Sequence, residues 1–92
     1  MLLPGGPELV SRVAILSGGA AREVEAAAQA GCDTYITGEA SHSHYYDAAE
    51  YGVNVIYGGH YATETVGVKA LAEHLRDRFQ LFVTFIDRPT GL

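Results

Sequence analysis

Glycine-rich turns recur every 20 residues along this chain, and each turn follows a short apolar segment. The turns are Gly18-Gly19, Gly38 and Gly58-Gly59, and the segments before them are residues 13–16, 34–37 and 54–57. Short apolar segments rich in β-branched and aromatic residues are typical of strands buried on both faces of a parallel sheet. The spacing therefore predicts successive strand–helix units. A leucine-rich repeat is excluded because its leucine consensus is absent.

Helical patterns fill the intervals between these segments, over residues 20–30, 41–51 and 61–79. The last pattern is the clearest, because five apolar residues fall on one stripe of the helix: Val68, Leu71, Ala72, Leu75 and Phe79. We expect this stripe to face the core. Gly31 and Gly52 fit left-handed positions just beyond helix ends, and Ser41 fits an N-cap.

A fourth run of β-forming residues, 81–86, completes the pattern. The chain is therefore predicted to be one layered α/β domain, residues 1–92, with the element order βαβαβαβ and a mostly parallel four-stranded sheet. A chain of 92 residues can bury one core but not two. Residues 87–92 are expected to form a short tail that docks through Leu92.

Composition excludes several classes of function. The net charge is −5 and only six residues are Lys or Arg, so the clustered positive charge that binds nucleic acid is missing. No segment approaches the roughly 20 apolar residues that span a bilayer, and the N-terminus does not resemble a signal peptide. We therefore expect a cytoplasmic protein with no membrane partner. The single cysteine, Cys32, is expected to be buried and inert.

His60 and Glu64 are the first candidates for chemistry. Right-handed crossovers between parallel strands place the glycine turns at the carboxyl edge of the sheet, so Glu39 and His60 are expected to share that edge. His60 and Glu64 lie four residues apart, on one face of the last helix, and can hold one metal ion between them. The positive end of the helix dipole disfavours a bare cation, so further anionic ligands must come from elsewhere in the fold, a missing segment or a partner chain.

Other interpretations of the polar residues stay open at this point. His60 can instead cap the turn, with Glu64 interacting favourably with the start of the helix. His44 and Asp47 lie three residues apart and can share a helical face, but a solvated or aromatic-packed His44 is favoured. The Gly18-Gly19 turn can hold a phosphate through free N–H groups, although it lacks the known phosphate-binding motifs and a tight turn is favoured.

Several segments closely resemble the C-terminal part of the NIF-three-like, YbgI-type family, whose members are often called GTP cyclohydrolase I type 2 homologs. These segments are 35–39, 52–56, 58–64, 67–71 and 83–87. The block Gly59-His60-Tyr61-Ala62-Thr63-Glu64 is the most specific of them. The resemblance covers nearly the whole chain from about Val13.

The resemblance implies a site with two divalent metal ions in a metal-dependent, hydrolase-like protein. It assigns His60 and Glu64 as metal ligands, with Glu39, His44 and Tyr61 as candidates to support the ligands or to contact substrate. The remaining ligands belong to an N-terminal part that has no counterpart here, and the paired histidines of the family pattern are absent. The site is therefore expected to be incomplete, and the chain to be weakly active or inactive.

The resemblance also implies a ring-shaped homo-oligomer, usually a hexamer, and the missing N-terminal half is a second expected partner. An alternative function is a non-catalytic oligomerisation or interaction module in which His60 and Glu64 are inherited but unused. Nucleotide binding at the Gly18-Gly19 turn, without catalysis, is a third hypothesis.

Overall fold

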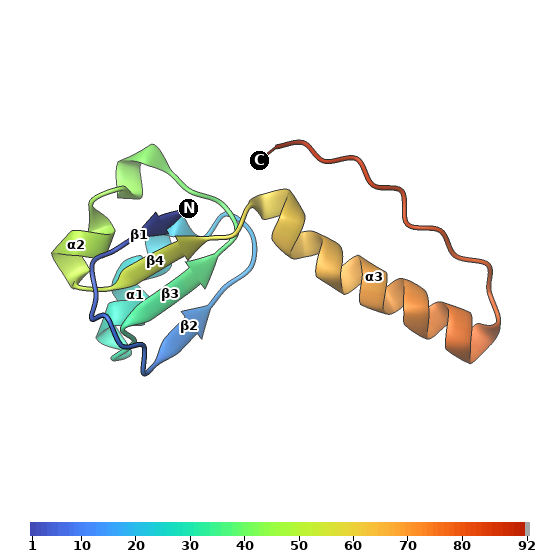
Figure 1. Ribbon diagram of the computed structural model, residues 1–92, viewed down its shortest axis with the longest axis horizontal. Helices are drawn as coiled ribbons and strands as arrows, with labels where there is room; N and C mark the ends of the chain where they lie inside the picture. Colours follow the sequence, from blue (N-terminus) through green and yellow to red (C-terminus); the bar gives the residue numbers. More distant parts are fainter. Residues whose placement is uncertain (92) are drawn as a thin grey trace.

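The computed structural model describes residues 1–91 as an α/β body from which one long helix projects (Figure 1). The strands are β1 (Leu2–Leu3), β2 (Val13–Ile15), β3 (Thr34–Thr37) and β4 (Asn54–Tyr57). The α-helices are α1 (Val24–Gln29), α2 (Asp47–Tyr51) and α3 (His60–Phe79), and two 3-10 turns are η1 (Ala21–Glu23) and η2 (His42–His44). Leu92, the residue expected to dock the tail, lies outside the described residues.

The four strands form one sheet in the order β1-β4-β3-β2. Strands β2, β3 and β4 are parallel, and β1 pairs antiparallel with β4. The prediction of an α/β fold with a mostly parallel four-stranded sheet is confirmed. The prediction that residues 81–86 supply the fourth strand is wrong, because α3 carries this segment away from the sheet and β1 takes the free edge of β4. The two residues of β1 are too few to give a recognisable pattern in the sequence.

The core lies on one face of the sheet, beneath α1 and α2. Strand residues Tyr35, Val55 and Tyr57 are buried there against Val24 of α1 and Ala48 of α2. Residues on the opposite face alternate with these, as the pleat of a strand requires. The core thus fills the space between the sheet and two short helices.

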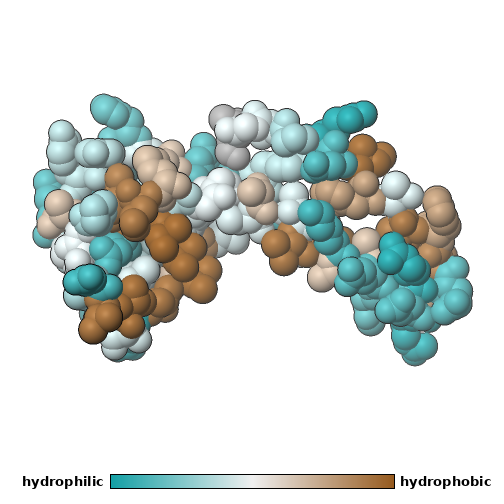
Figure 2. All heavy atoms as spheres, viewed as in Figure 1, coloured by the Kyte–Doolittle hydropathy of each residue, from teal (hydrophilic) through white to brown (hydrophobic). Residues whose placement is uncertain are grey.

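The second face of the sheet has no helical cover. Leu2, Ile56, Ile36 and Ile15 are registered neighbours across all four strands and form an aliphatic row on this face. Leu2 is 59% and Ile15 73% exposed. Figure 2 shows a band of apolar residues crossing this part of the molecule. The expectation that these strands are buried on both faces is therefore wrong for this chain.

Glycines end the first two helices as the sequence predicts. Gly31 and Gly52 have φ values of 76° and 68°, in the left-handed region that glycine adopts without strain. Ser41 occupies the predicted N-cap position, at the start of η2, but its hydroxyl bonds the hydroxyl of Ser43 rather than a backbone amide. Cys32 is only partly buried and packs against the core.

The apolar stripe of α3 does not face the core. No residue of this helix is buried, and Val68, Leu71 and Leu75 line a hollow that Val83 and Phe85 of the tail close from the other side. The tail runs back along the helix (Figure 1), and the Lys69 ammonium lies 4.6 Å from the Phe85 ring centroid. Periodicity identified an apolar face correctly but not its partner.

Although α3 has 20 residues, no helix within residues 1–91 combines the length and apolar content that a membrane crossing requires.

The three glycine turns are joined by hydrogen bonds at the carboxyl edge of the sheet. The Gly18 carbonyl accepts from the amides of Gly38 and Glu39, at 3.2 and 3.1 Å, and from the Thr37 hydroxyl at 3.1 Å. The Gly38 carbonyl in turn accepts from the Gly59 amide at 2.8 Å. The exits of β2, β3 and β4 therefore form one connected edge, which places Glu39 beside the start of α3.

Asp33 ties the N-terminal segment to the start of β3. Its Oδ2 accepts from the amides of Ser11 and Arg12, at 2.8 and 2.9 Å. Loss of solvent around Asp33 raises its pKa. Hydrogen bonds from the Arg12 and Ser11 amides lower the pKa, and together the hydrogen bonds outweigh the loss of solvent, so the net pKa is below the ordinary value. The ionised carboxylate thus stabilises the folded state.

We expect Gly38→Ala to destabilise the fold by about 1 to 3 kcal/mol, because overpacking a close backbone contact forces the chain apart. A Cβ at this position would lie 2.9 Å from the Gly18 carbonyl oxygen and 3.0 Å from Thr63 Oγ1. Urea unfolding monitored by circular dichroism measures the change. Gly67→Ala is the control, since its Cβ meets nothing within 4 Å and alanine favours a helix. Equal loss of stability in both variants would contradict the role of Gly38.

A second prediction concerns the pH dependence of stability. The folded pKa of Asp33 lies below its unfolded value of about 3.9, so its stabilising contribution is present above that pH and is lost as the pH falls through the folded pKa. We expect Asp33→Asn to lower the melting temperature at neutral pH, and the difference to shrink in acid. Thermal melts from about pH 7 to about pH 2.5 test this. Asp77→Asn, on the exposed face of α3, should change the melting temperature at neither pH.

Candidate metal centre

The first turn of α3 places His60 at the carboxyl edge of the sheet. Gly59 precedes it with a φ of 92°, in the region that favours glycine, and this turn directs the chain from β4 into the helix. The Thr63 amide and hydroxyl both donate to the Gly59 carbonyl, at 3.0 and 2.8 Å. The backbone that carries His60 is therefore fixed on both sides, by Thr63 within the helix and by the Gly59–Gly38 bond to the sheet edge.

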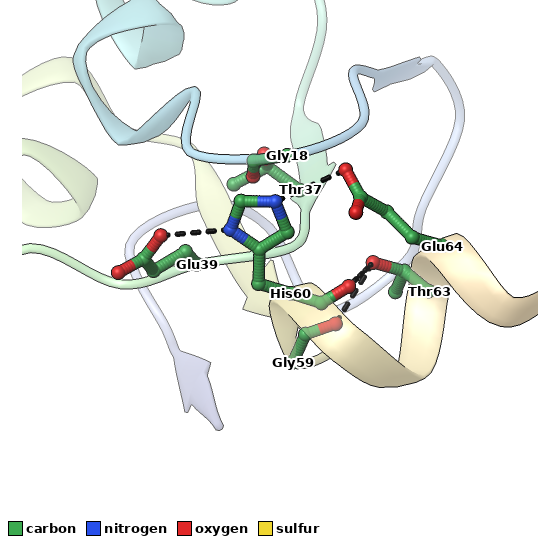
Figure 3. Close-up of polar contacts among 7 residues, drawn as sticks. All are labelled: Gly18, Thr37, Glu39, Gly59, His60, Thr63 and Glu64. Carbon is green, nitrogen blue, oxygen red and sulfur yellow. Dashed lines mark hydrogen bonds and ion pairs between the residues drawn. The ribbon is translucent and has the colours of Figure 1, made fainter. Parts of the chain in front are cut away.

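The His60 imidazole lies between two carboxylates (Figure 3). Its Nδ1 is 2.9 Å from Glu39 Oε2, and its Nε2 is 3.0 Å from Glu64 Oε1. All three side chains are partly exposed, at 36% for His60, 48% for Glu39 and 56% for Glu64. Hydrogen bonds to Glu39 and Glu64 raise the pKa of His60. The site is thus open to solvent and favours positive charge.

The Nε2 side of the ring suits a cation. When the ring is neutral and its Nδ1–H donates to Glu39, Nε2 and Glu64 Oε1 face each other as two lone-pair donors only 3.0 Å apart. Such donors repel unless a proton or a cation lies between them. Their separation is one that two ligands of the same divalent ion can have when each bond is about 2.0 to 2.2 Å long. These two residues therefore fit a metal ion.

The donor set for that ion is incomplete. Within residues 1–91, no group of three or more His, Cys, Asp or Glu residues converges so that it can hold a metal. Glu39 is bonded to the opposite nitrogen of the ring, so it does not add a third donor beside Nε2. A stable centre needs ligands beyond those that this part of the chain supplies.

Two of the other candidate residues have different partners. His44 Nδ1 lies 2.8 Å from Asp47 Oδ2, so these residues share a face as their spacing allows, but on the η2–α2 segment. The Tyr61 hydroxyl donates to Asp87 Oδ1 and accepts from the Arg88 amide, both at 2.8 Å, and so holds the tail. Of Glu39, His44 and Tyr61, the structure places Glu39 alone in hydrogen-bond contact with the His60 ring within residues 1–91.

The structure brings Glu39 and His60, which were expected to share the carboxyl edge of the sheet, into direct contact. Glu39 follows Gly38 just as His60 follows Gly59, and these two turns end neighbouring parallel strands. The strand register aligns Thr37 with Tyr57, so the residues that follow the two strands leave the sheet at the same edge. The same carboxylate lies beside the Gly18-Gly19 turn, where a Cβ on Gly19 would be 3.3 Å from Glu39 Oε2. A negative charge there disfavours phosphate at this turn.

An apolar cavity of about 230 Å³ opens beside Glu64. Tyr61, Thr65 and Val68 line it from α3, and Phe85 and Ile86 line it from the tail. The Tyr61 hydroxyl fixes the distance between these two walls through its bonds to Asp87 and Arg88. The polar cluster around His60 thus borders an apolar space, a combination that is common at small-molecule sites.

Known proteins resemble this chain in sequence and in fold. A GTP cyclohydrolase 1 type 2 homolog of Deinococcus radiodurans is 47% identical over 88 residues, which are 96% of this chain and 34% of that protein. Among solved structures, the protein ybgI, described as of unknown function, matches the whole chain with a TM-score of 0.93 at 41% identity, over 38% of its own length. TTHA1606 of Thermus thermophilus matches the whole chain with a TM-score of 0.86 at 44% identity, over 37% of its length.

This chain spans about a third of the length of the curated relatives it matches. The family model that describes Duf34/NIF3 (NGG1p interacting factor 3) proteins matches residues 1–90, which is nearly the full sequence. With that match and relatives at 41 to 47% identity, the chain belongs to the Duf34/NIF3 family.

Proposed function

We propose that this chain supplies His60 Nε2 and Glu64 Oε1 as ligands to a divalent metal centre in a hydrolase-like Duf34/NIF3 protein. The observation that carries the proposal is the 3.0 Å separation of these two donor atoms at an open sheet edge. The Glu39 carboxylate on the other ring nitrogen supports it, because ligating histidines usually donate their second N–H to such a group. Relatives named GTP cyclohydrolase 1 type 2 homolog support a hydrolytic reaction on a purine nucleotide.

The remaining ligands come from outside this chain. His60 and Glu64 supply one neutral and one anionic donor, whereas a centre with two divalent ions needs several more. The two thirds of the relatives' length that this chain does not span can provide them, and so can a neighbouring copy in a homo-oligomer. We therefore propose that the isolated chain binds metal weakly and has little or no activity. A cytoplasmic location is part of the same proposal.

In this centre the protein groups have distinct tasks. A bound divalent ion supplies Lewis acidity and an activated water. Glu64 contributes negative charge that offsets the positive end of the α3 dipole. His60 offers the lone pair of Nε2 to the ion, while its Nδ1–H donates a hydrogen bond to Glu39. The open cavity lined by Tyr61, Val68 and Phe85 offers apolar contacts to a substrate bound beside Glu64.

An assembly module is the second candidate function. The observation that favours it is the uncovered aliphatic row Leu2–Ile56–Ile36–Ile15, which is in register across the sheet. Monomeric proteins rarely leave such contiguous patches open. In this case His60 and Glu64 are not used, and homo-oligomers form without metal.

We expect His60→Ala and Glu64→Ala each to weaken binding of Co²⁺ to the 92-residue chain by about tenfold or more, because each removes one of two donors. Isothermal titration calorimetry and the visible absorption of Co²⁺ measure the affinity and the ligand set. His74→Ala and Glu73→Ala are matched controls, since both residues are exposed on the same helix. If all four variants bind Co²⁺ like the unmodified chain, the metal proposal fails.

Sedimentation with and without EDTA separates the two candidate functions. We expect a homo-oligomer that dissociates when Ile15→Glu places a charge in the aliphatic row, where burial of an unpaired carboxylate is costly. Val66→Glu is the control, because Val66 is 67% exposed on α3 and lies outside the row. Dissociation by EDTA of the unmodified chain would favour metal-bridged copies. Oligomers that resist EDTA and contain no metal would favour the assembly module.

A further inference from the structure

We propose that the C-terminal tails (residues 81–91) of two copies of this chain pair as antiparallel strands, and that Phe82 of each copy fills the apolar hollow between α3 and the tail of the other. This interface is separate from the metal centre and from the aliphatic row, so the inference depends on neither function proposed above. It is carried by residues 81–86, which have the composition of a strand but pair with no strand within residues 1–91.

The backbone of the tail is extended and open for pairing. The tail runs back along α3 (Figure 1), and within residues 1–91 no backbone–backbone hydrogen bond joins residues 81–87 to another segment. It is nevertheless held in place, because the Tyr61 hydroxyl bonds both the Asp87 carboxylate and the Arg88 amide. An extended segment with free N–H and C=O groups is a template for a strand from another chain.

Phe82 is the anchor of the proposed interface. It is 97% exposed, more than any other large apolar residue that the structure describes. Val68, Leu71, Leu81 and Ile86, on α3 and the tail, are also more than half exposed. Proteins that function as monomers rarely leave such an apolar surface in water, so this surface is typical of one that another protein covers.

The hollow that receives the anchor has a volume of about 330 Å³ and is open to solvent. Leu71 and Leu75 line it from the stripe of α3, and Val83 and Phe85 line it from the tail. Successive side chains of an extended segment point to opposite sides, so Phe82 points away from the hollow of its own chain. An aromatic side chain that fills an apolar pocket of its partner is a common anchor of protein interfaces. A second copy supplies that side chain.

The tail is self-complementary in one antiparallel register. When Phe82 lies opposite Phe85 of the second copy, Thr84 lies opposite Val83 and Leu81 lies opposite Ile86. Aromatic and aliphatic pairs of this kind stabilise adjacent strands. Directly opposed residues share one face of a two-stranded ribbon, so Phe82 lies on the face where α3 of the second copy packs. The two copies are related by a twofold axis, and each supplies one anchor and one hollow.

A shift of one residue removes this fit. With Phe82 opposite Ile86, both α3 helices lie on the same face of the ribbon, because a slip of one residue moves every side chain to the other face. Phe82 and Ile86 of both copies then remain on an uncovered face. With Phe82 opposite Phe85, one helix lies on each face and both faces are covered.

Sedimentation equilibrium of the 92-residue chain tests the anchor. We expect Phe82→Glu to raise the dimer dissociation constant by about 30-fold or more, because it replaces a central aromatic anchor by an unpaired carboxylate. The circular dichroism spectrum should stay unchanged, since Phe82 is exposed within one chain. Val66→Glu is the control, because Val66 is exposed on α3 and does not line the hollow. A monomeric unmodified chain, or equal association of Phe82→Glu, would overturn the proposal.

Ile15→Glu separates this interface from the aliphatic row. Association that Ile15→Glu and EDTA leave intact, and that Phe82→Glu abolishes, would support the tail interface and refute the assembly role of the row. Association lost in Ile15→Glu and kept in Phe82→Glu would refute the tail interface. If each variant converts a larger oligomer into dimers, both interfaces are present and the proposal stands.

Disulfide formation tests the register. Cysteines at directly opposed positions of antiparallel strands can form a disulfide. In a Cys32→Ser background, we expect a mixture of Val83→Cys chains and Thr84→Cys chains to give a disulfide-linked dimer on mild oxidation, and neither chain alone to do so. A disulfide in Thr84→Cys alone would place the two residues 84 opposite each other and overturn the register that brings Phe82 to the hollow. Absence of a disulfide in the mixture would also overturn it.

Discussion

Hydrogen bonds between the three glycine turns determine the geometry of the candidate site. The carbonyls of Gly18 and Gly38 accept donors from the following turns, so the exits of β2, β3 and β4 cannot move independently. Side chains at these positions would push the turns apart, as the short contact that a Cβ on Gly38 would make indicates. Glycine is needed here for close approach of backbones as well as for turn conformation, and that approach brings Glu39 within reach of His60.

Much of the body was predictable because its signals are local. The segments 34–37 and 54–57 match β3 and β4 residue for residue, and Gly31 and Gly52 end helices in the left-handed conformation. Errors arose where the outcome depends on tertiary partners. The segment 81–86 has the composition of a strand, but strand formation also requires a neighbour to bond, and α3 leads it away from the sheet. In contrast, β1 forms a strand with only two residues because the edge of β4 is available for pairing.

The same distinction applies to the site. Spacing alone placed His60 and Glu64 on one helical face, since a helix brings residues four apart together. The partner of Nδ1 lies 21 residues earlier in the chain, and no local pattern identifies it. His44 and Asp47 show a second limit of spacing, because their spacing only allowed the contact that forms, and the pair lies on a different segment from His60. Helical spacing identifies which residues can meet, and the topology of the sheet decides which of them share a site.

Exposed apolar surface and two neighbouring carboxylates are two unfavourable features of this chain. A parallel sheet is normally covered on both faces, and here one face carries an open aliphatic row while the stripe of α3 packs only on the tail. At the carboxyl edge, two carboxylates flank one imidazole and raise its pKa. Both features are unfavourable for an isolated chain of this size. Additional protein that covers the sheet face can bury the row and, under the metal function proposed above, can add ligands beside His60 Nε2.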